Sequence, residues 1–212
     1  MLFRSGSGLE FTWNGLKTDP SQAFERLSVQ EAFLRYANTD LLATICDPLQ
    51  PTPEKLREAC GKLGISFAAD DSWEDLFFRI FLEKIEPRLG VGRPTILFDY
   101  PISMAALSRP KPSDPQLAER FELYVCGLEL ANAFGELTDP ALQRRRFELD
   151  MEKKFRLYGE RYPIDEDFLA AVAVMPESSG IALGVDRLVM LATGASHIED
   201  ILWVPVAEPR IH

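Results

Sequence analysis

The chain has 212 residues, of which 46% are apolar, which is enough apolar material to close the core of one sizeable domain. It carries 33 acidic and 23 basic residues, a formal net charge of −10, whereas surfaces that bind nucleic acid are basic. Direct binding of tRNA or DNA is therefore disfavoured. No apolar run reaches the roughly 18 residues of a membrane span, so no membrane association is expected. The three cysteines form no C-x-x-C pair, which excludes a disulfide framework and a cysteine zinc site and favours a cytoplasmic location.

The N-terminal part of the chain predicts a hairpin followed by helices. Residues 9–13 alternate apolar and polar side chains and lead into Asn14-Gly15, a pair that favours a tight hairpin turn. Ser28 and Glu31 have the spacing of a capping box, which predicts the start of a helix. The expected helices are 28–38, 52–64 and 72–87.

Beyond residue 94 the sequence becomes rich in residues that favour strands. Residues 95–101 predict a buried strand that ends at a proline. Residues 108–115 are rich in proline, which excludes helix and sheet and predicts a surface loop. Further strands are expected at 120–126, 128–137, 180–184 and 201–205, and helices at 139–158 and 185–192. This order of elements predicts an α+β fold.

Two consecutive strands carry an unusual load of acidic side chains. With a two-residue loop at Cys126-Gly127, Glu122 lies opposite Ala131, and Glu122 and Glu129 fall on one face of the hairpin. Neighbouring carboxylates repel each other unless a cation lies between them, and a divalent metal or a substrate ammonium group would supply it. The alternative is that this is the solvated face of an antiparallel sheet.

Asn132, Phe134 and Glu136 alternate along the second of these strands and therefore share a face. Their parity places them on the face opposite to Glu129 unless a β-bulge intervenes near Leu130. A site that uses all of these residues requires the bulge. The alternative is an ordinary alternating edge strand.

A glycine-containing strand at 180–184 leads into a helix with an arginine in its first turn. Gly180 and Gly184 leave a flat shelf on which a planar ring can lie, and Arg187 can stack on that ring or bind a phosphate. This arrangement suits a nucleotide. A close contact between strand and helix needs the same glycines, so that alternative stays open.

The basic run at 144–146 interleaves with acidic residues along the helix expected at 139–158. Such a pattern is typical of a solvated helix face. The alternative is a docking stripe for an acidic protein.

Three blocks occur in a specific order: RFELY at 120–124, GLELANAFGELTD at 127–139 and GIALGVDRLVML at 180–191. Together they resemble the C-terminal part of the catalytic domain of class II lysyl-tRNA synthetases, and the last block resembles class II motif 3. Within that superfamily they are closest to the short ligases that attach lysine, preferably as its β-isomer, to a lysine side chain of elongation factor P. The resemblance implies a class II antiparallel sheet flanked by helices in one partial domain over 1–212. In this division 24–92 is a mainly helical insertion and 93–212 is the sheet with motif 3.

The resemblance also implies ATP and Mg²⁺ as cofactors, lysine or β-lysine as substrate and elongation factor P as partner. Glu122 and Glu129 correspond to the carboxylates that hold magnesium on the ATP phosphates. Gly184 and Arg187 correspond to the nucleotide side, with Arg187 as the catalytic arginine that stacks on adenine and reaches the γ-phosphate. The residues that correspond to the lysine pocket are Asn132, Phe134, Glu136, Gly180 and Ala182.

Nothing in the chain resembles motif 1, which forms the dimer, or motif 2, whose arginine holds the α-phosphate. We expect both to precede residue 1, so the fold is expected to be N-terminally truncated, inactive alone, and either homodimeric or self-associating. The alternative is a catalytically dead relative that binds a nucleotide, an amino acid or a protein. A bulge that places Glu122, Glu129 and Glu136 around one pocket would favour retained ligand binding, whereas a collapsed pocket would favour the dead relative.

Overall fold

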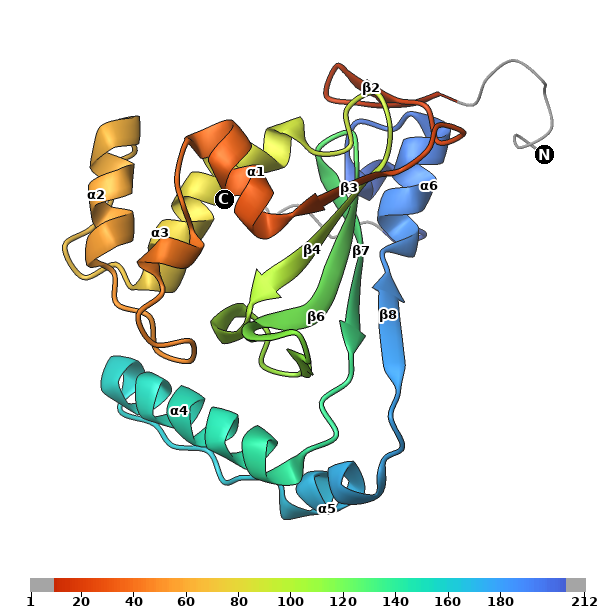
Figure 1. Ribbon diagram of the computed structural model, residues 1–212. Helices are drawn as coiled ribbons and strands as arrows, with labels where there is room; N and C mark the ends of the chain where they lie inside the picture. The colour runs from red at the N-terminus through yellow and green to blue at the C-terminus, as the bar shows by residue number, and fades with distance from the viewer. Residues whose placement is uncertain (1–9, 205–212) are drawn as a thin grey trace, which may run out of the picture.

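The computed structural model describes residues 10–204, whose strands form a two-stranded sheet and a six-stranded sheet (Figure 1). The order in the larger sheet is β3-β4-β6-β7-β8, and the short β5 pairs with β6. β3 and β4 are parallel, and the other pairs in this sheet are antiparallel. The strands are β1 (Phe11–Trp13), β2 (Leu16–Thr18), β3 (Glu25–Ser28), β4 (Thr95–Pro101), β5 (Pro110–Lys111), β6 (Asp114–Val125), β7 (Leu128–Gly135) and β8 (Ser179–Leu183). The predicted α+β class is confirmed.

Helices surround this sheet on several sides. In Figure 1 α1 and α3 lie beside β3 and β4, α6 lies beside the end of β8, and α4 and α5 lie at the end away from β1 and β2. The α-helices of the described residues are α1 (Val29–Ala37), α2 (Glu54–Leu63), α3 (Trp73–Ile80), α4 (Pro140–Tyr158), α5 (Glu166–Val174) and α6 (Val185–Thr193). β3 lies within the segment expected to be mainly helical, and it belongs to the sheet because it pairs with β4.

Local capping determines where the first helices begin and end. The Ser28 side chain accepts a hydrogen bond from the N–H of Glu31, and the Glu31 carboxylate accepts one from the N–H of Ser28, as the capping box predicts. Asn38 ends α1 in the left-handed conformation, with φ 47°. Ser72 and Asp75 form the same reciprocal pair at the start of α3. These helix boundaries therefore follow from short-range polar contacts.

The main core lies between α1, α2, α3 and one face of β3 and β4. Leu27 of β3 and Leu97 of β4 are fully buried in it. Phe33 of α1 and Phe77 of α3 pack against each other with ring centroids 4.9 Å apart. Burial of this apolar surface is the main driving force for packing the helices on the sheet. The β6–β8 part of the same face carries polar side chains instead.

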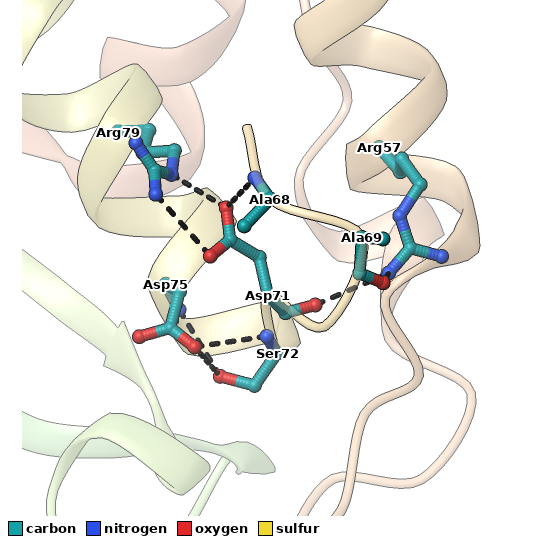
Figure 2. Close-up of polar contacts among 7 residues, drawn as sticks. All are labelled: Arg57, Ala68, Ala69, Asp71, Ser72, Asp75 and Arg79. Atoms are coloured by element: carbon teal, nitrogen blue, oxygen red, sulfur yellow. Dashed lines mark hydrogen bonds and ion pairs between the residues drawn. The ribbon is translucent and has the colours of Figure 1, made fainter. Parts of the chain in front are cut away.

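The Asp71 side chain stabilises the loop that joins α2 to α3 (Figure 2). Its carboxylate accepts hydrogen bonds from the N–H of Ala68 at 2.9 Å and from Nε of Arg79 at 2.6 Å. Arg57 of α2 donates to the carbonyl oxygens of Ala69 and Asp71, each at 3.2 Å. The hydrogen bond from Arg79 lowers the pKa of Asp71, which keeps the carboxylate charged. These contacts join α2 to the start of α3.

The proline-rich segment 108–115 is partly strand, which corrects the predicted loop. β5 pairs with β6, with Pro110 opposite Ala118 and Lys111 opposite Asp114. Proline lacks an N–H donor, so it is tolerated at a strand position where the ladder does not need that donor. Proline content alone therefore did not exclude a short edge strand.

Two further differences concern the C-terminal third. No strand forms at 201–204, which is the described part of the strand expected at 201–205, and Pro205 lies outside the described residues. α5 was not predicted, although Asp165 caps it by accepting a hydrogen bond from the N–H of Phe168 at 2.9 Å. The cap is a signal that the sequence offers.

No helix within residues 10–204 combines the length and the apolar character needed to cross a membrane. Cys46 is exposed, Cys60 and Cys126 are buried, and all three thiols are free. Burial raises the pKa of Cys60 and of Cys126, so both stay protonated at neutral pH.

The face of the sheet opposite to the main core exposes apolar side chains. Phe121 of β6, Ala133 of β7 and Ile181 of β8 lie side by side on this face and line an open hollow of about 440 Å³. Ile181 is 62% exposed and Leu183 is 48% exposed. In the described part of the chain β8 is also the outermost strand on its side of the sheet. An open edge and an exposed apolar face together favour association with another surface.

We expect the chain to self-associate through this face. Replacing Ile181 with Glu should weaken self-association at least about tenfold, because it puts a charge among the apolar side chains. Sedimentation velocity over a range of concentrations measures this. Val174→Glu is the control, since Val174 is an exposed apolar residue that belongs to α5 and not to the sheet. A wild-type chain that stays monomeric at every concentration would contradict the expectation.

Candidate active site

The β6–β7 hairpin turns at Cys126 and Gly127, whose φ values are 55° and 71°. Positive φ at both positions is the geometry of the tight turn that matches the twist of two strands. Val125 lies opposite Leu128 directly next to the turn, and Tyr124 lies opposite Glu129 in the following pair. The turn therefore confirms the predicted two-residue loop.

A β-bulge then shifts the register by one residue. Leu123 pairs with Ala131, so Leu130 is the extra residue in β7. Glu122 consequently lies opposite Asn132 and not opposite Ala131, which corrects the predicted pairing. The bulge that a combined site requires is present, and it places Asn132 on the same face as Glu129.

The register places the predicted residues in adjacent rows across the sheet. One row consists of Glu122 on β6, Asn132 on β7 and Ala182 on β8. The next row on the same face consists of Arg120, Phe134 and Gly180. Both rows continue the face whose β3–β4 part is covered by helices.

Glu122 is the buried centre of the site. It is 6% exposed, and its Oε2 accepts hydrogen bonds from the hydroxyls of Tyr100 at 2.5 Å and Tyr124 at 2.6 Å. Its Oε1 accepts one from Nη2 of Arg120 at 2.6 Å. Burial, together with the Glu122 carboxylate, raises the pKa of both tyrosines, so they remain hydrogen-bond donors at any physiological pH. One lone pair on Oε1 remains for a further partner.

Arg120 connects Glu122 to the rest of the pocket. Its Nε donates to Oδ1 of Asn132 at 3.3 Å, and its Nη1 donates to the carbonyl of Met104. The guanidinium lies over the ring of Tyr100, 4.4 Å from the centroid, and 5.6 Å from the centroid of Phe134. Arg120 is the first residue of the RFELY block, and no role was predicted for it.

Glu129 is the more accessible carboxylate, with its side chain 33% exposed. Partial burial and the charge of Glu122 raise its pKa. Arg187 on α6 donates from Nη1 to the carbonyl of Glu129 at 2.6 Å, and the same nitrogen lies 3.6 Å from the Glu129 carboxylate. A carboxylate whose pKa is raised by a neighbouring carboxylate lies in an environment that attracts a cation.

Glu86 is a third carboxylate that sequence analysis missed. It begins the short turn η4 (Glu86–Arg88), directly after the π-helical turn η3 (Phe81–Ile85). Partial burial and the charges of Glu129 and Glu122 raise its pKa. A π-helical turn often marks a functional region, but no sequence pattern identifies one in advance.

Gly180 makes room for the carboxylate of Glu136. A Cβ atom at position 180 would lie 2.5 Å from Oε1 of Glu136. The Gly180 end of the glycine shelf is therefore occupied by the side chain of Glu136. At the other end a Cβ on Gly184 would lie 3.4 Å from Cδ of Arg187, so the arginine stem lies close against the backbone. The predicted site residues thus lie along β6, β7 and β8, directly after β7 or at the start of α6, and they extend from Glu129 beside the hairpin turn to Glu136 beyond the other end of β7.

The donor set suits a magnesium ion that is held mainly by phosphates. Among residues 10–204 no three His, Cys, Asp or Glu side chains are grouped closely enough to hold a metal by themselves. Mg²⁺ is commonly bound by one or two carboxylates together with substrate phosphates and water. Glu122, with one oxygen lone pair available, and the partly exposed Glu129 would hold it in that way.

The sequence profile of tRNA synthetases class II (D, K and N) matches residues 7–208. The chain belongs to this family. The class II fold accounts for the largely antiparallel sheet, and the predicted resemblance is confirmed at the level of the family.

Three curated relatives are named "Elongation factor P--(R)-beta-lysine ligase". The protein of Proteus mirabilis (strain HI4320) is 45% identical over 188 residues, which cover 87% of this chain and 56% of the relative. Those of Photorhabdus laumondii subsp. laumondii and Salmonella typhi are 44% and 42% identical over 184 residues, 85% of this chain and 54% of each relative. The chain therefore spans about half the length of the relatives that it matches.

We predict that Gly180→Ala displaces the Glu136 carboxylate without unfolding the chain, because the new methyl group meets only the flexible end of that side chain. A crystal structure of the variant and its Tm measure this. Gly61→Ala is the control, since its Cβ meets nothing within 4 Å. Gly90→Ala should instead unfold the chain, because its Cβ would overlap the backbone of Tyr124. An unmoved Glu136 carboxylate in Gly180→Ala would contradict the prediction.

Proposed function

We propose that this chain carries the lysine pocket and the magnesium–triphosphate side of an ATP-dependent ligase, which activates lysine as an adenylate and transfers it to a lysine of elongation factor P. The observation that carries the proposal is the row of Glu122, Asn132 and Ala182, with Glu129 and Glu136 on the same face. The names of the relatives support the same acceptor and the β-isomer of lysine.

The lysine side of the site is formed by β7 and β8. Glu136, whose carboxylate lies over Gly180, would bind an ammonium group of the substrate. Phe134 lies beside the guanidinium of Arg120 and would pack on the aliphatic chain. Asn132 is oriented by Arg120 and would bind a polar group of the substrate near its reacting end.

The nucleotide side of the site is formed by β6, β7 and the start of α6. Glu122 and Glu129 would hold Mg²⁺, which when bound neutralises charge on the ATP phosphates. Arg187, tethered to the carbonyl of Glu129, would lie on the adenine ring and reach the terminal phosphate. Its stem lies against Gly184, which leaves the face of the guanidinium available for stacking.

Two bond exchanges complete the proposed reaction. A carboxylate oxygen of lysine attacks the α-phosphorus of ATP, a C–O–P linkage forms, and the bond to the β-phosphate breaks with release of pyrophosphate. The neutral amine of the acceptor lysine then attacks the acyl carbon and loses a proton as AMP leaves. The pocket contributes by holding carboxylate and phosphorus in line.

We also propose a cytoplasmic enzyme that acts on a protein and not on tRNA. The net charge of −10 disfavours contact with a nucleic-acid backbone. Three free thiols fit a reducing compartment. Self-association through the exposed apolar face of β6, β7 and β8 would produce a homodimer.

Lysine-dependent exchange of pyrophosphate into ATP tests the activation step. We expect little exchange from the chain alone and clear exchange from a chimera that joins it to the part of the Proteus mirabilis relative that it does not match. Transfer of labelled lysine or β-lysine to elongation factor P tests the second step. A folded chimera that binds ATP and lysine without any exchange would instead support a catalytically inert binding module.

We predict that Glu129→Gln weakens magnesium–ATP binding about tenfold, because a carboxylate that holds the cation is lost. The same change should raise the Tm at neutral pH. Because the pKa of Glu129 is raised, its ionised form opposes folding, and this destabilisation develops as pH rises from the ordinary carboxyl pKa through the raised value and is fully present above it. Calorimetry and thermal unfolding measure both effects, with Glu148→Gln on the exposed face of α4 as control. Equal affinity before and after the change would exclude the metal assignment.

We predict that Ala182→Gly in the chimera improves the use of α-lysine relative to β-lysine. The Ala182 methyl group lies beside Asn132 and reduces space near the substrate's α-carbon, where one carbon is worth about 1–3 kcal/mol of discrimination. The alternative is that this methyl group only packs against α6. The ratio of kcat/KM for the two isomers measures the effect, and Ala171→Gly on α5 is the control. An unchanged ratio would show that position 182 does not select the substrate.

A further inference from the structure

Arg146 on α4 is buried, which corrects the predicted solvated face at this position. It is 5% exposed, whereas its neighbour Arg145 is exposed. Other basic residues of the helix pair as predicted for a solvated face, such as Arg144 with Glu166 and Lys153 with Glu74. Arg146 is therefore distinct from the basic stripe around it.

The Arg146 guanidinium binds the backbone of the segment that follows η5 (Ile102–Met104). Its Nη1 donates to the carbonyl oxygens of Ala105 at 2.8 Å, Ala106 at 3.0 Å and Ser108 at 2.7 Å. Gln143, one turn earlier on α4 and 1% exposed, donates to the same Ala106 carbonyl at 3.4 Å. This segment has little regular structure, so its inward carbonyls depend on side-chain donors.

The same segment holds the backbone on both sides of Glu136. The N–H of Arg109 donates to the carbonyl of Gly135 at 2.7 Å, and the N–H of Leu137 donates to the carbonyl of Leu107 at 2.9 Å. Ser108 and Glu136 form the antiparallel bridge between them. Glu136 is therefore fixed at the end of β7 by a segment that Arg146 holds from the other side.

We propose that Arg146 is a positioning residue for the lysine pocket, which acts through residues 105–109 to hold Glu136 over Gly180. The proposal rests on the proposed function where it takes Glu136 to bind lysine. The coupling of Arg146 to Glu136 rests on the hydrogen bonds described above. Arg120 holds the residue directly before this segment from the site side, because it donates to the carbonyl of Met104. The segment thus lies between two arginines, one in the site and one on α4.

Burial of Arg146 is costly, which argues for a specific role. Its Nε and Nη2 are buried without a hydrogen-bond partner, and burial lowers its pKa. An unpaired buried N–H costs about 1–3 kcal/mol. An apolar side chain would avoid that cost but would leave the three carbonyls without this donor. A lysine ammonium could donate to them, but only as a point charge on a flexible stem, without the fixed geometry of the guanidinium.

The test compares Arg146→Met with Arg145→Met on the same helix. We expect Arg146→Met to speed amide hydrogen exchange at Leu137 and Arg109 at least tenfold while the amides of α1 are unchanged. Lysine affinity should fall about tenfold and magnesium–ATP affinity should stay within twofold. Arg146→Lys should fall between wild type and Arg146→Met, and Arg145→Met should match wild type. If Arg146→Met does not fold, the same exchange and affinity measurements are made on Arg146→Lys and Gln143→Ala instead.

Wild-type exchange at Leu137 together with wild-type lysine affinity in these variants would overturn the proposal. Equal loss of lysine and magnesium–ATP affinity would also overturn it, because that result indicates general destabilisation. Glu136→Gln separates this outcome from failure of the proposed function. If Glu136→Gln leaves lysine affinity unchanged, the lysine assignment fails, and the exchange at Leu137 alone then decides whether Arg146 fixes the backbone of Glu136.

Discussion

One extra residue in β7 determines which side chains meet in the candidate site. Leu130 has no partner on β6, so the residues after it change face relative to a regular hairpin. Without this bulge Asn132 would lie on the opposite face from Glu129. With it, the carboxylates of the hairpin, the amide of Asn132 and the small residues of β8 share one surface. Because β8 pairs along the shifted part of β7, the positions of Gly180 and Ala182 depend on the same residue.

The candidate site combines a buried carboxylate that is held by three hydrogen bonds with a less constrained one beside it. Glu122 accepts these hydrogen bonds from Tyr100, Tyr124 and Arg120 and keeps one oxygen lone pair available. Glu129 is partly exposed, with Arg187 beside it, and its pKa is raised. The firmly held carboxylate of Glu122 next to the less constrained carboxylate of Glu129 favours binding of a positively charged ligand. In the function that we propose, specificity comes from Asn132 and Glu136, which are placed by backbone pairing.

Much of this architecture follows from short-range patterns in the sequence. The capping boxes at Ser28 and Ser72, the turn at Cys126-Gly127 and the end of α4 at Gly159 are each decided by a few adjacent residues. The bulge at Leu130 was named from the sequence only as the condition for a combined site, because Leu130 looks like any other apolar strand residue. The burial of Arg146 was missed, because Arg146 looks like its neighbours Arg144 and Arg145. Its environment depends on a chain segment that local spacing does not place.

The two ends of the sheet differ in how far apart in the chain their paired residues lie. β6 and β7 are joined by a two-residue turn, so the hairpin that carries the acidic side chains needs almost no loop closure. β3 and β4 pair in parallel across 70 positions, with α1, α2 and α3 in the intervening chain. Contacts between distant residues form more slowly than local ones. Formation of the hairpin around the bulge therefore requires far less loop closure than docking of the helical layer on β3 and β4.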